Sequence, residues 1–154
     1  MSNRNKLTHL DSLPDYILQP RPDVALVTGV FDILHVGHVQ LIEAASQHGM
    51  VWVGINGDRA VKWLKGEGRP VNTYTDRAAM LAALEHVSAV FEIVDTRVDG
   101  AIRAVKPAYW IKGGDYTLET LDKHEVQAAN DVGACIILFG RVGDYSTTKI
   151  LQRL

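Results

Sequence analysis

Short apolar segments alternate with amphipathic segments along most of this chain, and this alternation limits the fold more than any other feature. Five short, mainly apolar runs, each followed by glycine or a polar residue, occupy residues 24–28, 51–55, 90–94, 109–112 and 134–139. Runs this short and this continuously apolar are typical of parallel strands that are buried on both faces of a sheet.

Helical spacing of apolar residues fills the connections between these runs. We expect helices at residues 36–48, 59–64, 76–86, 98–105, 118–130 and 147–154, with Thr75 as the N-cap of the third. Strands that alternate with helices form right-handed crossovers. The sequence therefore predicts a single Rossmann-like, doubly wound α/β domain with a five-stranded parallel sheet in the order 3-2-1-4-5 and helices on both faces.

The first 23 residues differ from the rest of the chain, because they are polar and end in a stretch with two prolines. We expect residues 1–23 to be a lead-in segment that packs on the domain or contacts another subunit. Residues 24–154 then form the domain, and their number is large enough to bury a core.

The composition excludes several classes of protein. The formal net charge is -2, so the chain as a whole offers no basic field for nucleic acid. No apolar run approaches the ~20 residues that span a bilayer, and residues 1–11 do not resemble a secretory signal. The single cysteine, Cys135, lies in an apolar run, so we expect it to be buried and unreactive. We expect a cytoplasmic protein with neither nucleic acid nor membrane as a partner.

The carboxyl ends of the predicted strands carry groups that suit phosphate or ribose. Ligands of doubly wound sheets bind at this edge, where the strand order reverses. The polar residues that follow strands one, two, four and five include Thr28, Asp58, Lys112, Asp115 and Arg141. We therefore expect a site for a small phosphorylated molecule along this edge.

The segment 29–38 joins the first strand to the first helix and reads Gly-Val-Phe-Asp-Ile-Leu-His-Val-Gly-His. His35 and His38 are three residues apart at the predicted helix start, so both side chains share one face. Gly37 lets a phosphate approach the backbone, and the helix N-terminus adds N–H donors and partial positive charge. The segment is therefore predicted to hold an anion.

Two other interpretations of this segment stay open at the level of sequence. The histidines can be structural residues of the domain. Alternatively, Asp32, His35 and His38 can form a metal site, although no further histidine or cysteine at metal-ligand spacing completes the ligand set. We expect no metal bound by the protein alone.

Five motifs in order resemble those of the cytidylyltransferase-like nucleotidyltransferase superfamily, over residues 24–154. The segment 29–38 is similar to its G-x-F-D-x-x-H-x-G-H signature, and residues 112–116 are similar to its K-G-G-D-Y turn. Asp58 resembles its aspartate after strand two, Arg77 its helix arginine, and residues 141–150 its terminal R-x₄-S-T-T-x-I element. One H-x-G-H sequence is a weak signal, whereas five motifs in register indicate the superfamily.

The segment 64–72, Leu-Lys-Gly-Glu-Gly-Arg-Pro-Val-Asn, narrows this resemblance. It is similar to a loop in the adenylyltransferase domain of bacterial ADP-heptose synthases. Glycerol-3-phosphate cytidylyltransferases share the histidine motif but lack this loop. Residues 1–23 do not resemble the sugar-kinase domain that usually precedes the heptose domain, and Tyr145 stands where a small or aliphatic residue is more usual.

The resemblance implies transfer of a nucleoside monophosphate from a nucleoside triphosphate to a small phosphorylated acceptor, with release of pyrophosphate. It implies His35, His38 and Lys65 as catalytic residues and Arg69 and Arg77 as acceptor ligands. The nucleotide ligands that it implies are Thr28, Gly29, Val30, Phe31, Asp32, Gly37, Asp58, Lys112, Gly113, Asp115, Arg141, Tyr145, Ser146, Thr147 and Thr148. We expect a homodimer, with Mg²⁺ held mainly by the phosphates and water.

The leading hypothesis is adenylyl transfer from ATP to a sugar phosphate similar to heptose 1-phosphate. Its nearest rival uses CTP and a polyol phosphate such as glycerol 3-phosphate. A non-catalytic nucleotide-binding module is a rival of another class, because a fold does not guarantee activity, and a metal-dependent hydrolase is a third. The sequence lacks a P-loop, a G-x-G-x-x-G turn after the first strand and a G-x-S-x-G elbow, which argues against the classes that these motifs mark.

Overall fold

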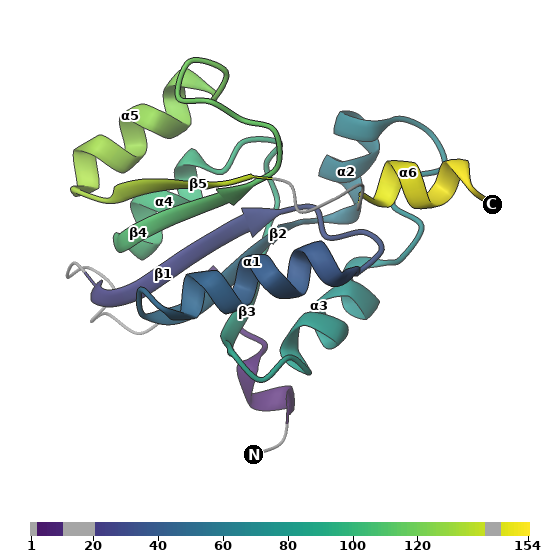
Figure 1. The fold of residues 1–154 in the computed structure, drawn as a ribbon, viewed down its shortest axis with the longest axis horizontal. Coiled ribbons are helices and arrows are strands. Elements are labelled where there is room, and N and C mark those ends of the chain that lie inside the picture. Colours follow the sequence, from purple (N-terminus) through teal and green to yellow (C-terminus); the bar gives the residue numbers. More distant parts are fainter. Residues whose placement is uncertain (1–2, 11–20, 141–145) are drawn as a thin grey trace.

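Five parallel strands form one sheet in the order β3-β2-β1-β4-β5 (Figure 1), which confirms the predicted topology. The computed structural model describes residues 3–10, 21–140 and 146–154. The strands are β1 (Arg21–Gly29), β2 (Met50–Asn56), β3 (Val87–Ile93), β4 (Pro107–Gly113) and β5 (Cys135–Phe139). Each predicted run corresponds to one of them.

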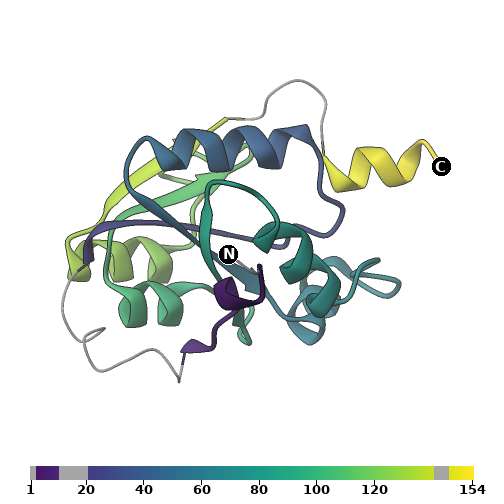
Figure 2. The ribbon, with the colours of Figure 1, turned by 90° about the horizontal axis from the view of Figure 1, so that it is seen from below.

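Six helices lie in the described connections and after the last strand. They are α1 (Val36–Ser46), α2 (Asp58–Lys65), α3 (Tyr74–Ala82), α4 (Asp99–Val105), α5 (Lys123–Val132) and α6 (Thr147–Gln152). Helices α1 and α3 cover one face of the sheet, and α4 and α5 cover the other (Figures 1 and 2). Within the described residues, no helix combines the length and the apolar character needed to cross a membrane.

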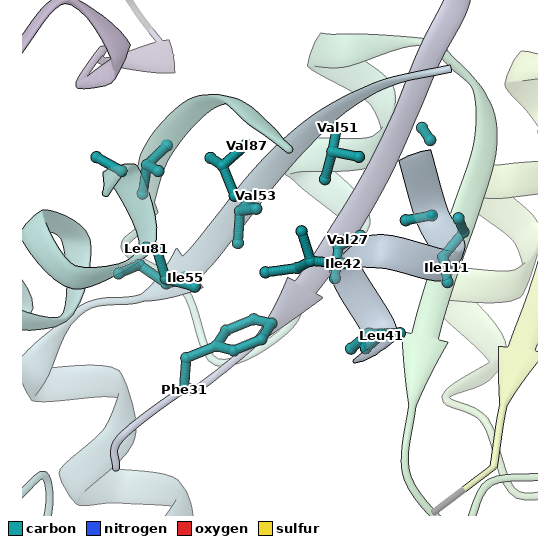
Figure 3. Packing of buried hydrophobic residues seen from close by; sticks show 14 of the residues in the cluster. Val27, Phe31, Leu41, Ile42, Val51, Val53, Ile55, Leu81, Val87 and Ile111 are labelled. Atoms are coloured by element: carbon teal, nitrogen blue, oxygen red, sulfur yellow. The ribbon is translucent and has the colours of Figure 1, made fainter. Parts of the chain in front are cut away.

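Two apolar cores, one on each face of the sheet, hold these layers together. The first lies between the sheet and helices α1 and α3 (Figure 3) and includes Val27, Leu41, Ile42, Val53 and Leu81. The second lies against α4 and α5 and includes Trp52, Phe91, Ile102, Trp110 and Ala128. Because both faces are covered, residues 24–27 of the central strand β1 are fully buried, which explains their continuous apolar character.

Part of the lead-in segment packs on the edge of the sheet. Residues Asn3–Lys6 form a 3-10 helix, and Leu7 forms an isolated parallel bridge with Val90 of β3. The Thr8 N–H donates a hydrogen bond to the Val90 carbonyl at 2.9 Å. Of the two roles expected for this segment, residues 3–10 therefore adopt the first, packing on the domain.

The third helix begins two residues before its predicted start. Its N-cap is Thr73, whose hydroxyl accepts a hydrogen bond from the Asp76 N–H at 3.3 Å, so the prediction of Thr75 as the cap is wrong. The helix ends at Ala82 rather than at residue 86, because residues 83–86 turn into β3. Its apolar spacing predicts the helix but does not define either end.

The fifth helix begins five residues after its predicted start. Asp122 is its N-cap, and the carboxylate accepts hydrogen bonds from the N–H groups of His124 and Glu125 at 2.8 and 3.3 Å. Residues 117–121 form a turn instead of helix. An aspartate followed three residues later by a glutamate is a common helix start, so this boundary was open to prediction.

The last strand lies at the edge of the sheet, where it pairs with β4 alone. Its first residue, Cys135, is exposed, so the prediction that this cysteine is buried is wrong. The other four residues of β5 are only partly buried. A short apolar run predicts a strand, but it does not separate a central strand from an edge strand.

Candidate active site

A cleft of about 650 Å³ opens at the carboxyl ends of the strands, next to the point between β1 and β4 where the strand order reverses. The turn between β1 and α1, the end of α2, the segment before α4 and the start of α6 contribute to its walls. The predicted site residues that line it are Thr28, Gly29, Val30, Phe31, Asp32, His35, Gly37, His38, Lys65, Arg69, Lys112, Gly113, Ser146, Thr147 and Thr148. One cleft therefore collects most of the predicted site.

Three of the described residues that were predicted for the site do not line the cleft. Asp58, Arg77 and Asp115 lie elsewhere in the described structure. Arg141 and Tyr145 lie outside the described residues, so their roles stay predictions.

His35 is the N-cap of α1 and is bonded to its own turn. Its Nδ1 accepts a hydrogen bond from the Gly37 N–H at 3.1 Å, and Nδ1 of His38 accepts one from the His35 N–H at 3.3 Å. A ring nitrogen that accepts a hydrogen bond carries no proton, so each neutral imidazole carries its proton on Nε2. The cap thereby sets the tautomer of both histidines and makes each Nε2–H a donor.

Phe31 and Gly29 shape the surroundings of the two imidazoles. The rings of His35 and His38 stack with centroids 3.8 Å apart, and the Phe31 ring lies 4.9 Å from that of His38. Phe31 has a φ of 51°, a left-handed conformation that costs energy for a bulky residue. A Cβ at Gly29 would meet the Phe31 ring at 3.0 Å, so a glycine there leaves space for the ring that supports His38.

Both histidines are neutral at pH 7. Burial lowers the pKa of His35 from its ordinary value of 6.5. Burial and the neighbouring His35 ring lower the pKa of His38 to about 3. The pair therefore offers N–H donors without a fixed charge, and a donor of this kind stabilises the charge that develops on a phosphate oxygen.

We expect acidification below pH 6.5 to destabilise the fold through His38. The pKa of His38 is about 3 in the fold and near 6.5 in the unfolded chain, so between these values the unfolded chain binds the extra proton. The corresponding stability is present above pH 6.5 and is lost as the pH falls towards 3. Urea unfolding at a series of pH values measures this loss.

The matched variant for this pH dependence is His38→Asn, which does not titrate but keeps an acceptor near the position of Nδ1. Its free energy of unfolding is expected to fall less between pH 6.5 and 4 than that of the unsubstituted protein. If the free energy of unfolding fell by the same amount in both proteins over this pH range, His38 would not be the source of the pH dependence.

Asp32, in the same turn, holds the loop that follows α2. Its carboxylate accepts hydrogen bonds from Arg69 Nε at 2.7 Å and from the N–H groups of Val71 and Asn72 at 2.9 Å. Burial raises the pKa of Asp32, but the bonds from Asn72, Val71 and Arg69 outweigh burial and hold that pKa below 3.8. Both carboxylate oxygens are therefore directed at this loop.

The segment 29–38, which joins β1 to α1 and carries both histidines, is called the histidine turn below. The described residues give no support to its interpretation as a metal site. No group of three or more histidine, cysteine, aspartate or glutamate side chains among them is placed to hold a metal ion. Asp32, which that interpretation needs as a ligand, is already bonded to Arg69 and to two backbone N–H groups.

Arg77 is enclosed by the protein, with 1% of its surface exposed. Its Nε donates to the Asn72 carbonyl at 3.0 Å, and its Nη1 donates to the carbonyls of Val30 and Asn56 at 2.7 and 2.8 Å. Its Nη2 donates to Asp58 Oδ1 at 2.8 Å. The structure corrects the prediction of an acceptor ligand, because a side chain with no accessible surface joins parts of the protein and does not meet a substrate.

Four cationic side chains line the cleft and differ in how they are paired. Arg97 Nε lies 3.5 Å from Asp99 Oδ1. Arg69 is bonded to Asp32, and Lys112 Nζ lies 3.6 Å from Glu125 Oε2. Lys65, the last residue of α2, is exposed, and no described carboxylate lies within ion-pair distance of it. Among the described residues, Lys65 therefore brings to the cleft a charge that no carboxylate neutralises.

Glu125 and the segment before α4 also line the cleft, although the sequence did not predict them as site residues. Glu125 is 5% exposed, and its Oε1 accepts a hydrogen bond from the Val98 N–H at 3.1 Å. The Lys112 ammonium group lies 4.8 Å from the centroid of the Tyr116 ring. The aspartate and glutamate three residues apart at the start of α5 are the signal that could have drawn attention to Glu125.

The start of α6 lies against the histidine turn. The Thr147 hydroxyl lies 3.2 Å from both the N–H and the carbonyl oxygen of Ile33. Ser146 is the N-cap of α6, and its hydroxyl accepts a hydrogen bond from the Lys149 N–H at 3.0 Å. The described part of the terminal motif and the histidine motif, more than a hundred residues apart in sequence, thus line one cleft.

Comparisons with known proteins agree with this geometry. A family model described as cytidylyltransferase-like matches residues 26–153. The bifunctional protein HldE of Mesorhizobium japonicum is 41% identical over 132 residues, which are 85% of this chain and 26% of that protein. The protein of the same name from Bradyrhizobium diazoefficiens is 44% identical over 133 residues. The chain therefore spans about a quarter of the length of these curated relatives.

Solved structures share the fold at lower identity. A lipopolysaccharide core biosynthesis protein from Thermoplasma volcanium superposes with a TM-score of 0.63 at 23% identity, over 80% of this chain and 98% of that one. A pantoate-beta-alanine ligase from Francisella tularensis gives a TM-score of 0.52 at 16% identity, over 97% and 72%. With the fold, the cleft and the family match in agreement, the chain belongs to the cytidylyltransferase-like family.

Proposed function

We propose that this chain transfers a nucleoside monophosphate from a nucleoside triphosphate to a sugar phosphate, and that its substrates are ATP and a sugar similar to heptose 1-phosphate. The observation that carries the proposal is that one cleft brings together two neutral histidine donors, Lys65 and Arg69, and that Lys65 pairs with no described carboxylate. The heptose-type loop at residues 64–72 and the HldE relatives support the choice of substrates.

In the proposed reaction, an oxygen of the acceptor phosphate attacks the α-phosphorus of the triphosphate. A new P–O bond forms, the bond from the α-phosphorus to the bridging oxygen breaks, and pyrophosphate leaves with that electron pair. The attacking oxygen is already ionised near neutral pH, so no general base is needed. Catalysis then depends on positioning and on stabilisation of the developing charge.

Each cleft residue has a proposed task in this reaction. The Nε2–H groups of His35 and His38 donate to oxygens of the α-phosphate and the leaving group. Lys65 contacts the transferred phosphoryl group from the acceptor side, and the free end of the Arg69 guanidinium binds the acceptor phosphate. We further propose that Arg141 and Ser146 bind the β- and γ-phosphates.

The part of the cleft lined by Lys112, Tyr116 and Glu125 suits a nucleobase better than a phosphate. There Lys112 and Glu125 neutralise each other, and Tyr116 offers an aromatic face. A lysine donor beside a carboxylate acceptor matches a ring nitrogen next to an exocyclic amino group, an edge that adenine and cytosine share. We therefore propose that ATP and CTP are accepted in preference to GTP and UTP.

The proposed Mg²⁺ is held by the triphosphate and water, since the described protein residues supply no three-ligand group of their own. Bound in this way, Mg²⁺ would supply positive charge that offsets the charge of the phosphates. A homodimer also stays a proposal.

A substrate panel tests the proposed function. The protein is incubated with each of the four nucleoside triphosphates and with heptose 1-phosphate, another sugar 1-phosphate or glycerol 3-phosphate, and pyrophosphate is measured with pyrophosphatase. ATP with the heptose phosphate is expected to give the highest kcat/KM. CTP with glycerol 3-phosphate as the best pair would favour the rival cytidylyltransferase, and turnover with no pair would contradict the proposed function.

A further inference from the structure

We infer that Asp32 and Arg77 are positioning residues that fix Lys65 relative to the histidine turn, so that Asp32 affects turnover through Lys65. This inference rests on the proposed function, in which Lys65 contacts the transferred phosphoryl group. Helix α2 and the loop after it, residues 58–73, are called the Lys65 arm below.

Arg77 ties both ends of the Lys65 arm to the histidine turn. Its guanidinium donates to Asp58 at the start of the arm and to the Asn72 carbonyl near the end. The same group donates to the Val30 carbonyl, at the beginning of the turn that carries the histidines. A planar guanidinium with several donors in fixed directions is suited to holding three segments in one geometry.

Asp32 adds a second tie between the arm and the histidine turn. Its carboxylate binds the Arg69 side chain and the N–H groups of Val71 and Asn72, while the Asn72 amide donates to the Asp32 carbonyl at 2.8 Å. Asp32 is 1% exposed, so water competes little for these bonds. Side-chain and backbone bonds thus fasten the same short stretch of the arm.

The residues between Lys65 and these ties have little packing of their own. Gly66 and Gly68 have φ of 94° and 82°, and apart from the adjacent residues no described atom lies within 4 Å of the place where either would carry a Cβ. Glycines at such angles allow the chain wide conformational freedom. Lys65 ends helix α2, so the tie at Asp58 and the buried Ala60 and Val61 hold the chain before Lys65. The ties at Arg69, Val71 and Asn72 hold the chain after it.

A double-mutant cycle tests whether Asp32 acts through Lys65. Asp32→Asn removes the charge that binds Arg69 and two backbone N–H groups, and misplacement of a catalytic group by about 1 Å lowers the rate by about 10²-fold. We expect Asp32→Asn to lower kcat by about that factor, and to lower it by less than ~2-fold when Lys65 is already alanine, since coupled residues are not additive. Equal factors in both backgrounds would overturn the inference.

Amide hydrogen exchange provides a readout that does not depend on activity. In Asp32→Asn and in the milder Asn72→Ala, residues 66–72 are expected to exchange faster while the strands keep their protection. Unchanged exchange at residues 66–72 in both variants would overturn the inference. The control is Asp131→Asn, which breaks the exposed 2.7 Å pair with Arg103 far from the arm and is expected to alter neither readout.

Failure of the proposed function is distinguishable from failure of this inference. Suppose that the protein turns over no substrate pair, but that residues 66–72 exchange faster in Asp32→Asn. This result would contradict the proposed function and would support the inference that Asp32 holds the Lys65 arm in place. An active protein in which Lys65→Ala has normal kcat would overturn the statement that Asp32 acts through Lys65.

Discussion

Replacement of His38 by alanine is expected to lower kcat by about 10²–10³-fold, equivalent to about 2.7–4 kcal/mol, because one preorganised donor to a developing charge is lost. The Nδ1 acceptor for the His35 N–H is lost as well, and a missing helix cap lowers stability by about 1 kcal/mol. The protein is therefore expected to stay folded. Steady-state kinetics and a thermal unfolding curve measure the two effects separately.

Two further variants separate the two nitrogens of the His38 ring. Glutamine carries an N–H donor near the position of Nε2, whereas asparagine keeps an acceptor near the position of Nδ1. We expect His38→Gln to retain more activity than His38→Asn, even where the asparagine variant is the more stable protein. His86→Ala, an exposed histidine that does not line the cleft, is the control. Normal turnover in His38→Ala would refute the assignment of the histidines.

Replacement of Lys65 by alanine is expected to lower kcat strongly, by about 10²-fold or more, with little change in the affinity for the triphosphate. Lys65 lines the cleft, and no described carboxylate neutralises it. A charge that reaches the phosphoryl group only during transfer stabilises the transition state and leaves ground-state binding nearly unaltered. Single-turnover rates and nucleotide titrations distinguish these effects.

Lys62 is the matched control for Lys65. It lies on the same helix and is exposed, but it pairs with Glu67 at 3.3 Å and does not line the cleft. Lys62→Ala is expected to have nearly normal kcat. A variant of Lys65 that weakens nucleotide binding and leaves the maximal rate intact would remove Lys65 from the transition-state role.

The sheet could be predicted from the sequence because each strand is a local feature. A strand covered on both faces, such as β1, has a continuous apolar run, and the helices between the runs require parallel crossovers. The predicted strand order already places β5 at the edge of the sheet, but how much of Cys135 is covered there is a tertiary property that does not follow from its apolar neighbours. The starts of α3 and α5 depend on single capping residues, which apolar spacing does not reveal.

The histidine turn could also be predicted, since its parts lie within one contiguous segment. Arg77 could not be placed in the same way, because most of its acceptors are backbone carbonyls, two of them 21 and 47 residues away in sequence. Every residue type has a backbone carbonyl, so the sequence does not show which carbonyls accept hydrogen bonds from Arg77. The resemblance singles out Arg77 in the sequence, but only the structure shows that its side chain is buried. Because it is buried, it joins segments of the protein and does not bind the acceptor.

Asp32 shows a similar limit of sequence reasoning. Its place three residues before His35 suggested a nucleotide or metal ligand, whereas in the structure its carboxylate binds Arg69 and two N–H groups of a loop about 40 residues away. Glu125 was missed because its contacts with Lys112 and Val98 arise only when α5 packs beside β4.

An isotope-transfer experiment tests nucleotidyl transfer most directly. The protein is incubated with ATP and with heptose 1-phosphate whose phosphate oxygens carry ¹⁸O. The products are separated, and the ¹⁸O content of each is measured by mass spectrometry. Attack by the acceptor on the α-phosphorus predicts a nucleotide sugar that holds all of the label, together with unlabelled pyrophosphate. Labelled pyrophosphate, or free AMP in place of a nucleotide sugar, would contradict the proposed reaction.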